Sequence, residues 1–396
     1  MISNKFNFVV DRIVRDKAYP ALSKWEAEPY TPEWRQFVQH WPHTVPCELI
    51  EHCATHGVEY ELYTIDHFPV GSYYPIGIGF FNFGVDYFGL MSDAVHDALK
   101  SGQLTVLFYY HEGDNPYYIK ERLDGLCLAW DLPVDCYRFV SGNTAAKHIP
   151  GFIYFPDHEL LYWQRNKETD PAAIHTNFRN QDFTVLSRTH KWWRATAVAD
   201  LYRNNLLENS YWSYNTEVTI NDQFKDNPIE IDTLEIRNYL PEFIAGGPYR
   251  ADQLTAVEHN DHSRIELNHY TDSYCNIILE THFDADQSGG TFLTEKTFKV
   301  LKHGQPFVIV GPAGSLAALR NLGYRTFDHC MDNTYDLIEN NTQRWQAVLD
   351  TVRQLKNHNM KKWFTSCSED LKHNQNLFVA SKADRLNRLL TKLKTL

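Results

Sequence analysis

Apolar strand-like runs alternate with helix-like segments from residue 102 onward, and this alternation constrains the fold more than any other feature. LTVLFYY (104–110), CYRFVSGN (136–143) and GFIYFP (151–156) are short runs rich in β-branched and aromatic residues. The segment 119–132, between the first two, has helical spacing. Short buried strands separated by helices are typical of parallel sheets with helices on both faces. The predicted fold class is therefore α/β.

A second series of the same kind follows a polar stretch at 164–182. Its predicted elements are strand 183–188, helix 192–207, strand 274–281, a helix from Thr294, strand 306–312, helix 314–323 and the strand-like 324–329. Residues 1–60 look helical or irregular, and 213–270 show no clear pattern. At roughly 150 residues per domain, a chain of 396 residues suggests two or three domains. We expect domains at 1–175 and 176–339, followed by C-terminal helices within 340–396, at 340–356 and 369–394.

The composition is typical of a folded globular protein. Hydrophobic residues make up 43% and aromatic residues 14%, which is enough for a packed core and argues against disorder. The chain has no run of 18 apolar residues, so we expect no membrane span. The start, MISNKFNFVVDRIVRDK, is too charged for a signal peptide. Seven cysteines without a CxxC indicate a reduced, cytoplasmic protein without a zinc site.

Charge is unevenly distributed along the chain. Residues 340–396 hold 11 Lys and Arg against 4 Asp and Glu, a balance of +7 within a chain of net charge −12. The acidic remainder argues against non-specific binding of nucleic acid over the whole surface. The basic segment is either a solvated helical face or one patch that faces a polyanion.

The stretch FLTEKTFKVLKHGQPFVIVGP (292–312) is the strongest candidate for a binding site. Ligands of parallel α/β sheets bind beyond the carboxyl ends of strands, and strand 274–281 leads to this stretch. Thr294 is predicted to N-cap a helix and to leave its first backbone N–H groups for an anion. Lys296 and Lys299 would add charge on the same side, favouring a phosphate or diphosphate. Glu295 would then accept hydrogen bonds from a neutral diol such as that of ribose. The alternative for the whole stretch is an ordinary capped helix with surface charges and no ligand.

This motif resembles the nucleotide-sugar motif of the α1,3-fucosyltransferase family. It is more similar to bacteriophage-encoded glycosyltransferases that carry TEKTxKP followed by Gly and PF. Val300 stands where those sequences have Pro. The resemblance implies that Glu295 binds the ribose hydroxyls and that Lys296 binds the diphosphate.

Two further matches occur in the family's order. In VLSRTHKWWRATAVADLYRNNLL, Arg194 stands where the family has an Arg that binds the diphosphate. Arg188 belongs to the phage-type pattern and is a second candidate for the same role. Planar guanidinium groups suit this role because they meet phosphate oxygens bidentately. The alternative is that Arg194 pairs with Asp200 or Glu208.

FYYHEGDNP (108–116) resembles the family's FYTGENxxP, whose Glu is the proposed catalytic base. That role falls on Glu112, with Asp114 able to exchange roles with it. His111 and Gly113 depart from the family pattern.

The resemblance implies a GT-B fold, with two Rossmann-like domains facing across a cleft and C-terminal helices packing back on the first domain. It implies an inverting transferase that moves a sugar from a nucleoside-diphosphate sugar to an acceptor hydroxyl. The acceptor stays open: a hydroxymethylated pyrimidine in phage DNA, a glycan, a lipid and a protein are all compatible. A phage protein would act in the host cytoplasm. No metal or cofactor is expected, although Asp284-Ala285-Asp286 is an alternative metal motif. A catalytically silent nucleotide- or glycan-binding module is the competing class.

Overall fold

The computed structural model describes residues 5–10, 48–78, 81, 83–165, 174, 178–187, 190–214, 227–230, 236–250 and 265–396. The chain forms two compact units. Unit 1 comprises Met1–Leu160, Ser288–Gly290 and Ser381–Leu396, and unit 2 comprises Leu161–Gln287 and Thr291–Ala380. The chain thus changes units after Leu160, earlier than the predicted residue 175, and returns to unit 1 for its last helix.

Unit 1 contains a six-stranded parallel sheet in the order β2-β1-β3-β4-β5-β6. The strands are β1 (Phe6–Val9), β2 (Tyr60–Tyr63), β3 (Ser72–Ile78), β4 (Leu104–Tyr110), β5 (Tyr137–Ser141) and β6 (Phe152–Tyr154). Its helices are α3 (Glu48–His56), α4 (Asp93–Lys100), α5 (Pro116–Ala129), η2 (Thr144–His148), the start of α6 (Asp157–Arg165) and α16 (Lys382–Thr395). Asn115 caps the Tyr117 N–H at 3.0 Å and Pro116 follows it, so α5 begins three residues before the predicted start.

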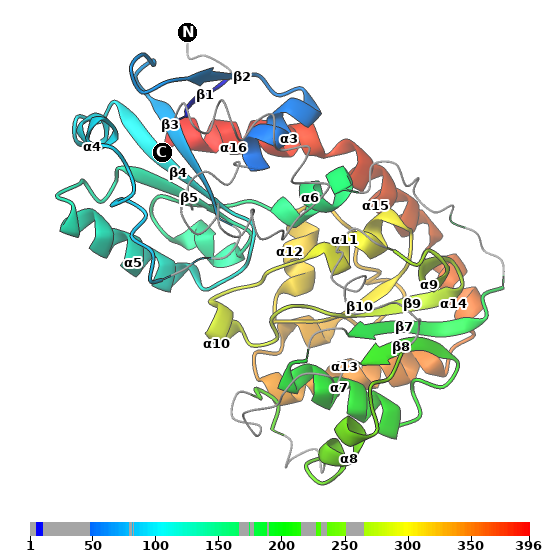
Figure 1. Cartoon of the computed structure of the whole chain (residues 1–396). Coiled ribbons are helices and arrows are strands. Elements are labelled where there is room, and N and C mark those ends of the chain that lie inside the picture. The colour runs from blue at the N-terminus through cyan, green and yellow to red at the C-terminus, as the bar shows by residue number, and fades with distance from the viewer. Residues whose placement is uncertain are drawn as a thin grey trace. The chain divides into compact units, whose positions relative to one another are not determined.

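Both faces of the unit 1 sheet are buried. Val106, Phe108 and Tyr110 of β4 belong to one apolar cluster, while Leu107 and Tyr109 belong to another. Successive side chains of a strand point to opposite faces, so β4 contributes to a core on each side. The second cluster includes Leu386, Leu389, Leu390 and Leu393 of α16, which lies beside α3 (Figure 1). Their spacing forms one apolar stripe of that helix.

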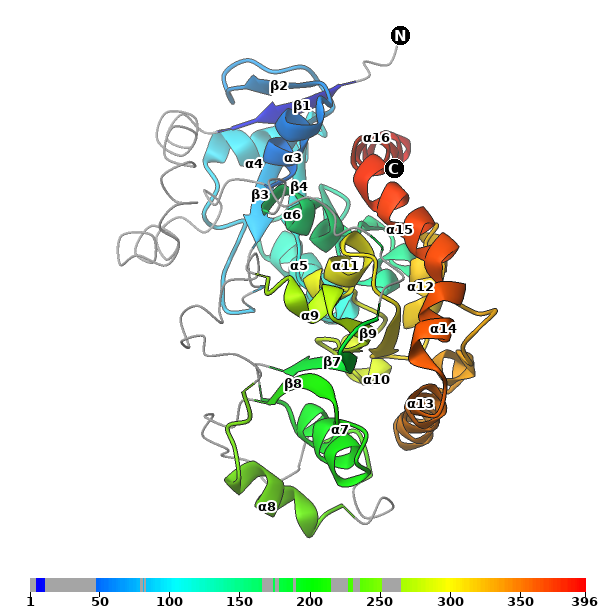
Figure 2. The same ribbon diagram turned by 90° about the vertical axis from the view of Figure 1, so that its right-hand side faces the viewer.

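Unit 2 contains a four-stranded parallel sheet in the order β10-β9-β7-β8. The strands are β7 (Gln181–Ser187), β8 (Ser210–Tyr214), β9 (Ser273–Leu279) and β10 (Phe307–Val310). Helices of the second half are α7 (Trp192–Arg203), α8 (Tyr239–Ala245), α9 (Asn268–Thr271), α10 (Ala285–Ser288), α11 (Glu295–Lys302), α12 (Ser315–Asn321), η4 (Thr334–Leu337), α13 (Asn341–Lys356), α14 (Met360–Ser366) and α15 (Ser368–Ala380). Figure 2 shows α7 and α8 next to each other. The strand order reverses between β7 and β9, which makes their junction the topological switch point of this sheet.

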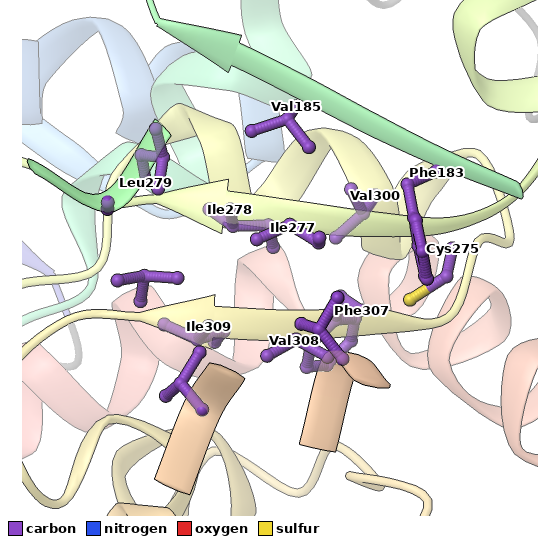
Figure 3. Close-up of a cluster of buried hydrophobic side chains, with 14 of the residues drawn as sticks. Phe183, Val185, Cys275, Ile277, Ile278, Leu279, Val300, Phe307, Val308 and Ile309 are labelled. Atoms are coloured by element: carbon purple, nitrogen blue, oxygen red, sulfur yellow. The ribbon is translucent and has the colours of Figure 1, made fainter. Parts of the chain in front are cut away.

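The core of unit 2 fixes the helix that carries the TEK motif. Every residue of β9 is buried, and Ile277 and Ile278 pack with Phe307 and Val308 of β10. Figure 3 shows these side chains together with Val300 of α11. Because the apolar side of α11 is buried in this core, the first turn of that helix is held at the end of β9.

The α/β class and the two Rossmann-like units are confirmed, and β4 has the predicted bounds. The strand expected at 324–329 is wrong. Tyr324 and Phe327 are buried, but Phe327 has φ +64, a left-handed conformation that turns the backbone. The helix expected at 369–394 is divided at Ser381 into α15 and α16. Within the described ranges, no helix combines the length and apolar character needed to cross a bilayer.

Candidate active site

The first candidate site lies at the topological switch point of unit 2. Strands β7 and β9 are parallel neighbours, with Thr184 paired to Asn276. Their carboxyl ends, Ser187 and Leu279, therefore lie at the same edge of the sheet. Residues that follow either strand meet there, although about 90 residues separate them in the sequence.

Glu280, immediately after β9, organises this edge. Its side chain is fully buried. One carboxylate oxygen accepts hydrogen bonds from the Thr294 N–H at 3.1 Å and the Thr297 hydroxyl at 2.5 Å. The other accepts from the Thr294 hydroxyl at 2.7 Å and the Thr281 N–H at 3.2 Å. A buried carboxylate is costly unless it is hydrogen-bonded, so these bonds hold the start of α11 against the end of β9.

The predicted N-cap is confirmed, because Thr294 Oγ1 accepts from the Lys296 N–H at 3.4 Å. Groups of the chain take some of the N–H donors that were expected to be left for an anion. The Thr294 N–H donates to Glu280, and the Thr297 N–H donates to the Thr294 carbonyl at 3.1 Å. Groups of the chain itself thus take these two N–H donors, and nearby side chains add positive charge to the site.

Three cationic side chains meet at the turn formed by residues 280–282. Arg194 donates to the Glu280 carbonyl oxygen through Nε at 3.2 Å and also through Nη2. Lys191 Nζ donates to the Thr281 carbonyl oxygen at 2.6 Å. Lys296 Nζ lies 3.4 Å from Thr281 Oγ1. We call Lys191, Arg194 and Lys296 the cationic cluster.

Sequence reasoning identified Arg194 and Lys296 but missed Lys191 and Glu280. Lys191 is the N-cap residue of α7, and its side chain makes no capping hydrogen bond. Glu280 has one visible signal, a charged residue directly after the apolar residues Ile277, Ile278 and Leu279. The alternative partner proposed for Arg194, Asp200, accepts instead from the Trp345 indole N–H at 2.9 Å.

The cationic cluster affects the pKa of the nearby His282 side chain. Burial, and after it the charges of Lys191, Arg194 and Lys296, together lower the pKa of its imidazole to about 4. The ring is therefore neutral at pH 7 although it lies among three cations. A bound anion would oppose this effect.

The remaining TEK residues lie in different surroundings. Glu295 Oε1 is 3.4 Å from Lys296 Nζ, and its side chain is 12% exposed, against 30% for Lys296. Lys299 Nζ lies 5.8 Å from the centre of the Tyr162 ring. Arg188 lies outside the described residues.

The second candidate site follows β4 in unit 1. Both predicted base residues, Glu112 and Asp114, lie in this loop. The Tyr110 hydroxyl donates a hydrogen bond to the Asp114 carboxylate. The Glu112 side chain is 28% exposed, with Oε1 3.8 Å from His111 Nε2. Both residues are accessible, Asp114 more than Glu112, but one Asp114 oxygen accepts from Tyr110.

Asn143, which sequence reasoning did not single out, holds the backbone of this loop. Its buried amide donates to the Gly113 carbonyl at 2.9 Å and to the Ser288 carbonyl at 2.7 Å. A Cβ at Gly290 would lie only 2.6 Å from Asn143 Oδ1. The close approach of the 288–290 segment therefore requires glycine at residue 290.

The alternative metal motif forms a local turn. Asp284 Oδ1 accepts from the Asp286 N–H at 3.0 Å at the start of α10. In the part of the chain that the structure describes, no group of three or more His, Cys, Asp or Glu residues is placed to hold a metal ion.

Comparison with known proteins gives two similar solved structures. One is described as the crystal structure of the DNA modifying enzyme β-glucosyltransferase in the presence and absence of the substrate uridine diphosphoglucose. It is 12% identical over 98% of this chain and 99% of its own, with a TM-score of 0.40. The other is a T4 phage BGT mutant in complex with UDP-glucose, 11% identical over 88% of this chain and 93% of its own, with a TM-score of 0.35. Identities and scores this low do not establish function. No family model matches the chain, and no curated protein does.

Proposed function

We propose that this protein is a glycosyltransferase that binds a nucleoside-diphosphate sugar at the cationic cluster of unit 2. The observation that carries the proposal is the convergence of Lys191, Arg194 and Lys296 on one turn at the switch point of a parallel sheet. Ligands of open α/β sheets bind at that position. Three positive charges at one turn suit a diphosphate better than a neutral ligand.

In this proposal the cationic cluster stabilises the leaving diphosphate. Negative charge grows on the diphosphate as the bond to the sugar breaks, and cations already oriented in the site stabilise that charge without reorganising. The backbone carbonyls of Glu280 and Thr281 orient Arg194 and Lys191. Positive side chains can perform this role without a metal ion, so we propose a metal-independent reaction.

Glu295 would bind the ribose hydroxyls next to the diphosphate. Its carboxylate is mostly buried and lies 3.4 Å from Lys296 Nζ, so one residue pair would reach both parts of the nucleotide. Lys299 and Arg188 are proposed as further diphosphate contacts, and each needs its own test.

Glu112 of unit 1 would act as the general base. It would take the proton from an acceptor hydroxyl as that oxygen attacks the anomeric carbon and inverts its configuration. A positioned base contributes about 10²- to 10⁴-fold to the rate. Glu112 is preferred over Asp114 because the Asp114 carboxylate already accepts from the Tyr110 hydroxyl, while Glu112 is partly exposed.

The acceptor is proposed to be a hydroxymethylated pyrimidine in DNA or a glycan. The +7 balance of residues 340–396 favours a polyanion, whereas the net charge of −12 opposes one. Transfer of a labelled sugar to hydroxymethylated DNA, to unmodified DNA and to oligosaccharides would separate these acceptors. DNA transfer that falls steeply with salt would support an electrostatic contact.

The first test is a thermal-shift panel of UDP, GDP, ADP, dTDP and CMP, with Mg²⁺ or with EDTA. A ligand at 100 times its dissociation constant stabilises the fold by about 2.7 kcal/mol. We expect one diphosphate to stabilise the wild type equally in EDTA, and Lys191→Met to reduce the shift. Lys372→Met is the matched control, because Lys372 is 58% exposed and pairs with Glu369 at 2.8 Å.

Two other outcomes are informative. No shift with any nucleotide would contradict the proposal. Binding without sugar transfer or donor hydrolysis would favour the silent binding module instead.

A further inference from the structure

Two cysteines of unit 2 lie in contact outside the candidate sites. The Sγ atoms of Cys330 and Cys367 are 3.2 Å apart. Cys367 is fully buried at the junction of α14 and α15, whereas Cys330 is partly exposed. The pair therefore joins a buried thiol to one that solvent reaches.

The surroundings of the pair favour a thiolate on Cys330. The hydrogen bond with the Cys367 thiol and the charge of His329 lower the pKa of Cys330 to about 7, against burial and Asp370, which raise it. The His329 ring lies 3.2 Å from the Ser366 carbonyl oxygen and 3.3 Å from the Asp370 carboxylate. The same hydrogen bond and burial raise the pKa of Cys367. Near neutral pH, Cys330 is thus partly ionised while Cys367 keeps its proton.

A small cavity lies against Cys330. It has a volume of about 110 Å³, and its lining includes Cys330, Met331, Thr351 and Leu355. Titratable and charged groups around the pair and the cavity are His329, Asp370, Arg325, Asp332, His358 and Cys275.

We propose that Cys330 and Cys367 form a thiol modification site that reacts with low-molecular-weight disulfides. The Cys330 thiolate attacks one sulfur of the small disulfide, forms a mixed disulfide and releases one thiolate. Cys367 then loses its proton and attacks Cys330 Sγ, which releases the second thiolate. Two protein thiols are oxidised to one disulfide, and the small disulfide is reduced to two thiols. The two Sγ atoms need to approach from 3.2 Å to about 2.05 Å.

A second cysteine pair serves as an internal control. Cys127 and Cys136 of unit 1 have Sγ atoms 3.8 Å apart, and both residues are buried. The hydrogen bond with Cys136, together with burial, raises the pKa of Cys127. In this pair the two sulfur atoms are close together, but solvent reaches neither thiol. It therefore tests whether closeness alone is enough for reaction, or whether an exposed thiol is also needed.

The test treats the reduced full-length protein with oxidised glutathione at pH 7.5, blocks the remaining thiols with N-ethylmaleimide after unfolding, and maps the peptides by mass spectrometry. We expect a Cys330–Cys367 cross-linked peptide as the main product, with Cys127 and Cys136 recovered as maleimide adducts. Equal cross-linking of Cys127 and Cys136 would overturn the proposal. So would glutathione that stays on Cys330 without cross-linking, or a Cys330 that does not react.

Variants assign the order of the two steps. Cys367→Ala is expected to trap glutathione on Cys330, and Cys330→Ala to leave Cys367 unmodified. An adduct on Cys367 in the second variant would overturn the assignment of Cys330 as nucleophile. Loss of the Cys367 hydrogen bond should also slow alkylation of Cys330 at pH 7 by roughly tenfold, as its pKa returns toward the ordinary range. An unchanged alkylation rate would contradict this account of the activation.

Discussion

The hydroxyl of Thr294 donates a 2.7 Å hydrogen bond to the buried carboxylate of Glu280, which joins the start of α11 to the end of β9. The Thr297 hydroxyl donates to the same carboxylate at 2.5 Å. This carboxylate lies beside the cationic cluster and accepts its hydrogen bonds from Thr281, Thr294 and Thr297. Glu280 therefore acts as a positioning residue that holds Lys296 near Thr281.

Glu280→Gln should destabilise unit 2. The amide keeps one acceptor oxygen, but it places an NH2 group against donors that the carboxylate accepted. Loss of hydrogen bonds to a buried charge costs about 1.5–3 kcal/mol each, partly recovered where a hydroxyl can reorient. We expect the free energy of unfolding, measured by urea denaturation, to fall by about 2 kcal/mol. Glu369→Gln is the control, because its side chain is 78% exposed and its surface ion pair contributes about 0–1 kcal/mol. Equal effects would show that Glu280 does not hold α11.

Lys296→Met and Lys299→Met should weaken nucleotide binding unequally. Lys296 Nζ lies at the turn that carries the cationic cluster, and a lost charge-assisted contact costs about 1.5–3 kcal/mol, or roughly 10- to 100-fold in Kd. Lys299 Nζ lies beside the Tyr162 ring, so we expect a smaller loss. Isothermal titration with the best diphosphate from the thermal-shift panel measures both. A larger loss in Lys299→Met would move the diphosphate away from Thr281.

The elements that sequence reasoning located share a local signal. Strand β4 coincides with an apolar run of seven residues, and Thr294 starts α11 because its hydroxyl caps the helix. Strand β1 was missed, because four residues are too few to show the alternation of apolar and polar residues that marks a strand. The turn at Phe327 was missed because its apolar neighbours look like a strand while its backbone is left-handed.

Long-range pairing explains what sequence reasoning missed in the site. Lys191 reaches Thr281 only because β7 lies next to β9, whereas β8, which follows β7 in the chain, lies on its other side. No spacing in the sequence encodes that strand order. Arg194 and Lys296 were found through their motifs, and Lys191 has no motif of its own.

Glu112→Gln should lower kcat for sugar transfer by about 10²- to 10⁴-fold without changing the affinity for the nucleotide, because the general base acts on the acceptor. Asp114→Asn should have a smaller effect, since the Tyr110 hydroxyl already donates to that carboxylate. Single-turnover kinetics with saturating donor, together with nucleotide titration, separate the two quantities. A larger loss of kcat in Asp114→Asn would exchange the two roles.

Glu159→Ala should release the last helix of unit 1. The buried Glu159 carboxylate pairs with Arg385 of α16, accepts from the Ser381 hydroxyl at 2.8 Å, and lies 3.8 Å from Lys382 Nζ. Removing one partner of a buried ion pair costs about 3–5 kcal/mol.

The control for this variant lies on the same helix. Asp384 pairs with Arg388, and their side chains are 60% and 71% exposed. Asp384→Asn should change the free energy of unfolding by less than about 1 kcal/mol. Hydrogen exchange of α16 amides should accelerate in the Glu159 variant alone. Protection that remains unchanged there would show that the apolar stripe of α16 suffices.

Acid should weaken the fold through two partly buried histidines with lowered pKa values. Burial lowers the pKa of His282 and of His56 to about 4, below the value of about 6.5 in an unfolded chain. Between pH 6.5 and 4 the unfolded state therefore binds more protons, and the free energy of unfolding falls as the pH falls through this window. His282→Asn should reduce that slope, as measured by urea denaturation at several pH values.

The same histidines test where the diphosphate binds. A diphosphate at the cationic cluster would oppose the charges of Lys191, Arg194 and Lys296, so the pKa of His282 should rise when UDP or the preferred diphosphate is bound. His56, in unit 1, is lowered by burial and by His52 and Lys382, and should not respond. NMR titration of the ring protons, with His282→Asn and His56→Asn used for assignment, measures both values. A saturating diphosphate that leaves the pKa of His282 unchanged would place the ligand elsewhere, because the three cations that it is proposed to contact are those that lower this pKa.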